Sequence, residues 1–330
     1  MKKLFVAVLA VAALASCAQE DVILNNDKAI TFGDAYVQNS TKAIYGDKDA
    51  DENVIEVEKF QVWGTVTPNG GTGTALPLYE GATVTRGTDA KNDEYGEPWI
   101  CSVQRFWTPN CVYAFYAVVD AAEDAVTDNA GVPTSIAYTA NGETDLLYGT
   151  TIASTDANNA VTGVNTNGAV AFAMQHLLSK VSFKVTNANS SADYTYNVTS
   201  ITVSGAYKSS TYNIAAGTWA TGTDEMDDLL FGSATDIASG NTHTFDKSFV
   251  IIPGKPELAI AIVVQTVFNG TAVGTQTHNL SVNKSGDKTQ IDFAKNTHYN
   301  FVVELEGKAI DFTIGTVGDF GTATPDTTIQ

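Results

Sequence analysis

The feature that most constrains the fold of this chain is a series of β-rich segments separated by Asn-Gly dipeptides. The segment 180–185 (KVSFKV) alternates apolar and polar residues, which is typical of a strand with one buried face. Further β-rich segments occur at 60–66, 257–268, 298–307 and 310–314, and the dipeptides are Asn69-Gly70, Asn141-Gly142, Asn167-Gly168 and Asn269-Gly270. Asn-Gly is a preferred turn between antiparallel strands. The pattern predicts an all-β protein of the sandwich class, with short helical turns only near 120–124 and 224–230.

The middle of the chain contains the expected domain boundary. Residues 154–168 (STDANNAVTGVNTNG) are polar and contain little that a core could bury. A chain of 330 residues is also long enough for about two domains. We therefore expect an N-terminal domain over residues 44–160 and a C-terminal domain over residues 161–330. The alternative is that residues 154–168 form a long hairpin loop inside one domain.

The first residues of the chain predict export and a lipid anchor. Two lysines precede an apolar run over residues 4–14, which is too short to span a bilayer and fits a signal peptide over residues 1–16. The run leads into LASC at 14–17, which resembles the bacterial lipobox. Acyl chains on Cys17 would then hold the protein at the outer membrane. An ordinary signal peptide with an incidental cysteine is the alternative.

Charge and the lack of catalytic motifs limit the functions open to the chain. It has 18 Lys and Arg against 37 Asp and Glu, a net charge of −19, and such a surface repels nucleic acids. The sequence contains no nucleophile elbow, phosphate-binding glycine loop, zinc-protease histidine pair or dinucleotide fingerprint. Its histidines are scattered, at positions 176, 243, 278 and 298. We therefore expect no nucleic-acid partner, no cofactor and no enzymatic activity.

Two cysteines outside the signal segment, Cys101 and Cys111, leave two states open. In an oxidising cell envelope they could form a disulfide that closes a small loop and stabilises the fold by about 3 kcal/mol. Spacing fixes no distance between the two Cα atoms, so it does not decide between a disulfide and two buried free thiols.

An acidic cluster near the N-terminus has the spacing of a calcium-binding loop. Its oxygen-bearing residues occupy positions 1, 3, 5, 7 and 12 of such a loop, and they are Asp47, Asp49, Asp51, Asn53 and Glu58. The glycine that the loop needs at position 6 is replaced by Glu52. We therefore expect no metal site here, and the cluster is a weak calcium candidate whose ordinary interpretation is a solvated acidic loop.

Several segments occur in a consistent order over nearly the whole chain. They are AITFGDAYVQNSTKA at 29–43, FQVWG at 60–64, RFWTPNCVYAFYAVV at 105–119, DLLYG at 145–149, VAFAMQHLLSKVSFKV at 170–185, FVIIPGK at 249–255, FAKNTHYNFVVEL at 293–305 and VGDFG at 317–321. Together with the lipobox, this ordered set resembles the fimbrillin family, the lipoprotein-derived type V pilins of Bacteroides-type bacteria. Phe320 stands where the family commonly has a tryptophan.

The resemblance implies two transthyretin-like β-sandwich domains in tandem, with Greek-key-type connections and few short helices. It also implies a lipoprotein precursor that a trypsin-like protease cuts after a basic residue near the first strand. We place the N-terminal propeptide at residues 17–43 and the cut between Lys42 and Ala43. Arg86 is the second candidate for the cut, although cleavage there would discard the strand at 60–64.

The resemblance further implies assembly by strand exchange. Removal of the propeptide would take away a plug strand in which Ile30 and Phe32 share one face. A donor strand from the C-terminal end of the next subunit would then fill the vacated place. Residues Ile310, Phe312 and Ile314 alternate as a donor strand requires, and they fit equally well the last strand of their own domain.

The expected function is therefore that of a shaft or tip subunit of a cell-surface fimbria that mediates adhesion. Its partners would be other fimbrial subunits, the maturation protease and, before processing, the outer membrane. One alternative is a monomeric surface lipoprotein that binds glycans through exposed aromatic rings, for which the candidates are Trp63, Trp99, Trp107 and Trp219. The third hypothesis is an envelope hydrolase.

Overall fold

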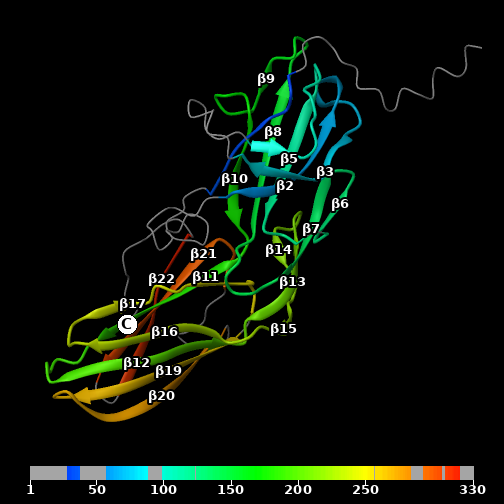
Figure 1. The fold of residues 1–330 in the computed structure, drawn as a ribbon. Helices are drawn as coiled ribbons and strands as arrows, with labels where there is room; N and C mark the ends of the chain where they lie inside the picture. Colours follow the sequence, from blue (N-terminus) through cyan, green and yellow to red (C-terminus); the bar gives the residue numbers. More distant parts are fainter. Residues whose placement is uncertain are drawn as a thin grey trace, which may run out of the picture.

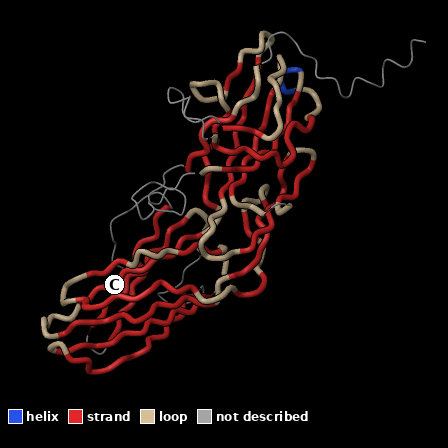
Figure 2. The backbone as a smooth tube through the Cα atoms, in the orientation of Figure 1, coloured by secondary structure: helices blue, strands red, loops and turns tan. Residues whose placement is uncertain are grey.

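The structure is a computed structural model that describes residues 28–37, 57–87, 99–122, 124–255, 257–283, 293–306 and 309–319. Almost all of this backbone is strand or loop, which confirms the prediction of an all-β protein (Figure 2). Within the described residues the one helical turn is η1 (Asn69–Gly71), at a predicted Asn-Gly turn. The helical turn expected near 224–230 is wrong, because β15 (Thr223–Glu225) and β16 (Leu229–Ile237) occupy this region.

The N-terminal strands form a sheet that closes on itself, here called the closed sheet. Its order is β10-β1-β4-β3-β2-β5-β8-β9, and β8 also pairs with β10, which completes the ring. The strands are β1 (Phe32–Val37), β2 (Lys59–Thr67), β3 (Leu76–Arg86), β4 (Trp99–Cys101), β5 (Val112–Val119), β8 (Leu147–Thr155), β9 (Val161–Thr162) and β10 (Val170–His176). One hydrophobic cluster fills this sheet.

Two further sheets pack face to face at the other end of the molecule (Figure 1). The first, the β11 sheet, contains β17 (Thr242–Thr244), β11 (Ser179–Asn187), β21 (Thr297–Glu306), β22 (Ala309–Asp319) and β18 (Phe249–Ile251). The second, the β12 sheet, contains β16, β12 (Tyr194–Ser204), β19 (Glu257–Phe268) and β20 (Thr271–Asn283). The ring of Phe183 on β11 lies 4.6 Å from that of Phe231 on β16, so aromatic side chains join the two layers.

The Asn269-Gly270 dipeptide forms the predicted turn between two long strands. Both residues have a positive φ, 47° and 76°, and β19 and β20 pair in an antiparallel hairpin around them. A turn with two positive φ values matches the twist of the flanking strands, which is why Asn-Gly suits it.

A fourth sheet connects strands from the two halves of the sequence. It contains β6 (Val126–Asn129), β7 (Val132–Thr139), β13 (Tyr207–Asn213), β14 (Thr218–Trp219) and β15, with β7 paired to β13. In Figure 1 this sheet lies between the closed sheet and the two packed sheets.

The change from the closed sheet to the β11 sheet occurs between His176 and Ser179. β9 and β10 follow the expected boundary at 160/161 and still pair with strands of the closed sheet. These pairings favour a boundary near residue 178 over one at 160/161, and the division into two domains stays a prediction.

Candidate functional site

The first described segment of the chain lies in the interior of the closed sheet. Ile30 and Phe32 are both buried, with 4% of each side chain exposed. The ring of Phe32 has four aromatic neighbours, with centroid distances of 5.7 to 6.2 Å, which are Phe60, Tyr79, Phe115 and Phe172. Burying a side chain of this size contributes about 1.5–3 kcal/mol to the free energy of unfolding. Ile30 and Phe32 therefore both face the interior of the closed sheet.

Backbone hydrogen bonds hold this segment on both edges. On one edge the N–H of Ile30 donates to the carbonyl of Arg105 at 2.8 Å, and β1 pairs with β4 in antiparallel fashion. On the other edge the N–H of Val170 donates to the carbonyl of Thr31 at 2.8 Å, and β1 runs parallel to β10. β1 is thus an inserted strand, and its two neighbours β4 and β10 are not paired with each other.

Two polar atoms beside this segment are buried without a hydrogen-bond partner among the described residues. They are the hydroxyl of Tyr79 and the Nε1 of Trp99. Burial raises the pKa of the Tyr79 hydroxyl above its ordinary value, so the group is neutral at physiological pH. Sequence reasoning did not identify Tyr79, because an isolated tyrosine in a β-rich stretch carries no signal of its environment.

The thiols of Cys101 and Cys111 are free in this structure, which is the second of the two states left open by the sequence. Cys101 is in β4 and Cys111 directly precedes β5, and β3 and β2 lie between these strands in the sheet order. Cys111 is buried and Cys101 is half-buried. Burial raises the pKa of both thiols, which keeps them protonated and slow to react.

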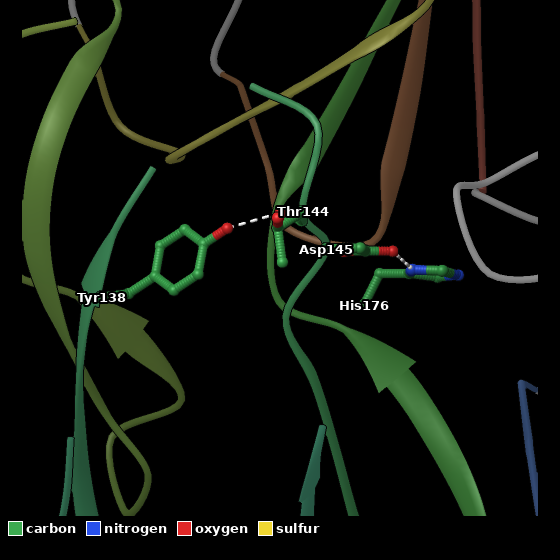
Figure 3. A network of polar contacts seen from close by, with 4 residues as sticks. All are labelled: Tyr138, Thr144, Asp145 and His176. Carbon is green, nitrogen blue, oxygen red and sulfur yellow. Dashed lines mark hydrogen bonds and ion pairs between the residues drawn. The ribbon is translucent and has the colours of Figure 1, made fainter. Parts of the chain in front are cut away.

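A polar network lies where the chain leaves the closed sheet (Figure 3). Asp145 precedes β8 and His176 ends β10, and Nδ1 of His176 contacts Oδ2 of Asp145. Their side chains are 0% and 1% exposed. In the same network the hydroxyl of Tyr138 donates to the carbonyl of Thr144. The sequence placed His176 only in the motif at 170–185 and gave no reason to pair it with Asp145, since the two are 31 residues apart.

The strand proposed as a donor, β22, pairs with another strand of its own chain. β22 is the edge strand of the β11 sheet and pairs with β21 in antiparallel fashion. The register sets Ile310, Phe312 and Ile314 against Leu305, Val303 and Phe301. In this state the segment is therefore the last strand of the sheet, the second of the two interpretations left open by the sequence.

Arg86 ends β3 and is half-buried, and its N–H donates to the carbonyl of Glu58 at 2.8 Å. Glu58 itself is exposed. The remaining predicted site residues lie outside the described residues, and they are Cys17, Lys42, Ala43, Asp47, Asp49, Asp51 and Asn53.

Among the residues that the structure describes, no three His, Cys, Asp or Glu side chains are grouped to hold a metal ion. Within the same residues, no helix has the length and apolar character needed to cross a membrane.

The four tryptophans pack against the hydrophobic clusters. Trp63 and Trp107 are buried with 4% exposure, and Trp99 and Trp219 are partly buried. The Nε1 of Trp219 donates to the carbonyl of Leu177 at 2.7 Å. None of the four offers a fully exposed ring for stacking on a sugar, which removes the feature that motivated the glycan-binding alternative.

Comparison with known proteins identifies related sequences and folds. Residues 41–319 match the family model described as fimbrillin-like. The fold is similar to a fimbrial protein from Bacteroides vulgatus, with 16% identity over 89% of this chain and 100% of that chain and a TM-score of 0.59. It is also similar to a candidate cell adhesion protein from Bacteroides uniformis, with 12% identity over 90% of this chain and 98% of that chain and a TM-score of 0.50. No curated protein matches the sequence.

Proposed function

Because this chain belongs to the fimbrillin-like family, we propose that it is a structural subunit of a cell-surface fimbria that assembles by strand exchange. In this proposal β1 is a removable plug, and an extended strand from a neighbouring subunit takes its place. The chain has no enzymatic role in this scheme, and its partners are other fimbrial subunits and a maturation protease. The fimbria would mediate adhesion.

The observation that carries the proposal is the position of β1. It is the first described strand, it inserts between β4 and β10, and it contributes buried side chains to a cluster that other strands complete. Losing it would leave unpaired backbone groups on two strands and vacate the places of Ile30 and Phe32. An added strand restores both kinds of contact, which is the physical basis of β-strand addition. Before cleavage β1 covers these edges and prevents premature association.

The maturation steps follow from the sequence. Lipid on Cys17 would anchor the precursor at the outer membrane, and a trypsin-like protease would cut between Lys42 and Ala43. The second candidate, Arg86, is disfavoured because a cut there would remove β2 and β3 together with the buried side chains of Phe60 and Tyr79. We also propose two transthyretin-like domains with a boundary after β10. The cluster inside the closed sheet lies wholly before this boundary, whereas the other cluster also takes in Trp63, Ile136 and Tyr138 from before it.

The donor in this proposal is β22 or the residues that follow it. β22 is an edge strand with one strand partner, so its release would break fewer pairings than release of an inner strand. Whether the subunit belongs to the shaft or to the tip depends on whether this segment is donated.

Mass spectrometry of the processed N-terminus, combined with gel analysis of oligomers, tests the proposal. We expect trypsin treatment of the full chain to yield a protein that begins at Ala43 and forms a ladder of oligomers. Lys42→Ala should remain an uncut monomer. Lys28→Ala, which replaces an exposed lysine in the same segment, is the matched control and should be processed like the wild type.

The thiol of Cys101 gives a second readout, because β4 is a direct neighbour of β1. In the Cys17→Ala background, thiol labelling of processed monomer should be faster than labelling of precursor. A processed protein that stays monomeric, compact and as slow to label as the precursor would show that β1 is not a plug.

A further inference from the structure

Strand β10 depends on β1 for most of its lateral pairing. Val170, Phe172, Ala173 and Met174 all have partners in β1, whereas the pairing of β10 with β8 involves only Gln175 and His176. If β1 leaves, as the proposed function requires, β10 keeps a strand partner only at its C-terminal end. β10 would also form one wall of the vacated place, so its position decides whether an incoming strand can pair there.

The remaining strand pairing of β10 and its buried ion-pair contact lie at that C-terminal end. The buried contact between His176 and Asp145 lies there, and the N–H of Leu177 donates to the carbonyl of Leu146 at 2.9 Å. Further along, the Thr151 hydroxyl donates to the carbonyl of Ala171. Of these attachments the Asp145–His176 contact is the one made between two ionisable side chains that are fully buried, where a hydrogen bond is stronger than in water.

Asp145 is in turn fixed by parts of the molecule that do not touch β1. Its loop is closed by Asn141, whose Oδ1 accepts the N–H of Thr144 at 2.7 Å. The N–H of Val250 in β18 donates to the carbonyl of Gly142 at 2.8 Å, which attaches the loop to the β11 sheet. Figure 3 shows the Tyr138 hydroxyl reaching the same loop from β7.

Gly142 is tightly enclosed within this loop. A Cβ placed there would lie 2.8 Å from a methyl carbon of Leu229 and 3.1 Å from the ring of Phe249, and the residue has φ of +83°. The loop therefore has little freedom to move, and it gives His176 a fixed point of attachment.

We propose that Asp145 and His176 are positioning residues for strand exchange, which hold β10 in place after β1 has left so that the space beside β4 stays open. This inference rests on the proposed function. In the precursor the pair is partly redundant, because β1 also fixes β10. In the processed chain it is a fully buried polar attachment of the wall that the incoming strand must meet, beside the apolar packing of Phe172 on Phe60.

A double-mutant cycle in two states of the full chain tests this inference. The variants are Asp145→Asn, His176→Gln and the double variant, in which two amides can again form a hydrogen bond. Each is studied as precursor and after trypsin processing. The readouts are deuterium uptake over residues 170–176 and binding of a synthetic peptide with the sequence of residues 28–37. Leu258→Ala removes a buried side chain of β19, in a different sheet, and is the matched control for general destabilisation.

We expect the precursors of all variants to protect β10 from exchange. After processing, each single variant should lose this protection and bind the peptide at least about tenfold more weakly than the wild type. The double variant should recover part of the binding. Leu258→Ala should have a lower melting temperature and the peptide affinity of the wild type.

Equal coupling of the two residues in precursor and processed chain, or peptide binding unchanged in both single variants, would overturn the inference and leave the proposed function standing. If the processed wild type itself binds no peptide, the proposed function fails and the inference fails with it. Should a single variant not fold as precursor, the comparison between the double variant and Leu258→Ala decides the question. Peptide binding that is weaker than in the wild type for the double variant, and unchanged for Leu258→Ala, supports the inference, whereas wild-type binding in both overturns it.

Discussion

Replacing Phe32 by alanine should destabilise the precursor while leaving the processed protein unchanged. Phe32 is only 4% exposed, and its ring lies beside four aromatic rings. Truncating a buried phenylalanine costs about 3–5 kcal/mol, because the transfer free energy of the ring is lost and a cavity remains. We place Phe32→Ala in the upper part of this range, because strands on several sides of the ring limit collapse of the cavity.

Urea denaturation of precursor and processed protein measures this difference. The midpoint of the precursor should fall, whereas the processed chain lacks residue 32 and should unfold and assemble as the wild type does. Thr31→Ala replaces the exposed neighbour of Phe32 and is the control, with an expected change within about 0.5 kcal/mol. A loss below about 1 kcal/mol for Phe32→Ala would refute the role of this ring as the main anchor of β1. A changed processed protein would refute the claim that β1 departs.

Three further outcomes are expected. Gly142→Ala should lower the free energy of unfolding by about 1–3 kcal/mol because of its positive φ and the nearby Leu229 methyl group, whereas Gly274→Ala, with open space around it, should be nearly neutral by thermal denaturation. Burial lowers the pKa of His278, so near and below the ordinary histidine pKa of about 6.5 the unfolded chain binds more protons than the folded chain. The free energy of unfolding should therefore fall as the pH drops through about 6.5. This fall should be smaller in His278→Gln. Because burial raises the pKa of the Cys111 thiol, its labelling at pH 8 should stay slow in the folded precursor and reach the rate of a free thiol only in denaturant.

The sequence predicted the local features of the fold well where one residue determines them. Alternation at Val181, Phe183 and Val185 correctly predicts a strand with one buried face. Asn269-Gly270 correctly predicts a hairpin, because few other dipeptides accept two positive φ values. Asp224–Leu230 failed as a helical turn, since short polar segments carry little periodicity and the pairing of β13 with β15 decided their conformation.

Contacts between distant segments could not be read from the sequence. The inward orientation of Phe32 was predictable from alternation, but its stacking on Phe172 depends on a parallel pairing of β1 with β10 that no local pattern encodes. The Asp145–His176 contact has the same origin, because it depends on the register between β8 and β10, which brings the residue before β8 next to the last residue of β10. The separation of Cys101 from Cys111 by two intervening strands is likewise a property of sheet order, which sequence spacing does not specify.

The parallel pairing of β1 with β10 also has a consequence for the order in which the chain folds. β1 can complete its pairing only after Val170–Met174 have been synthesised, more than a hundred residues later in the chain. Closure of the ring is therefore a late step in folding, because β1 lacks one of its two neighbours until β10 has been made.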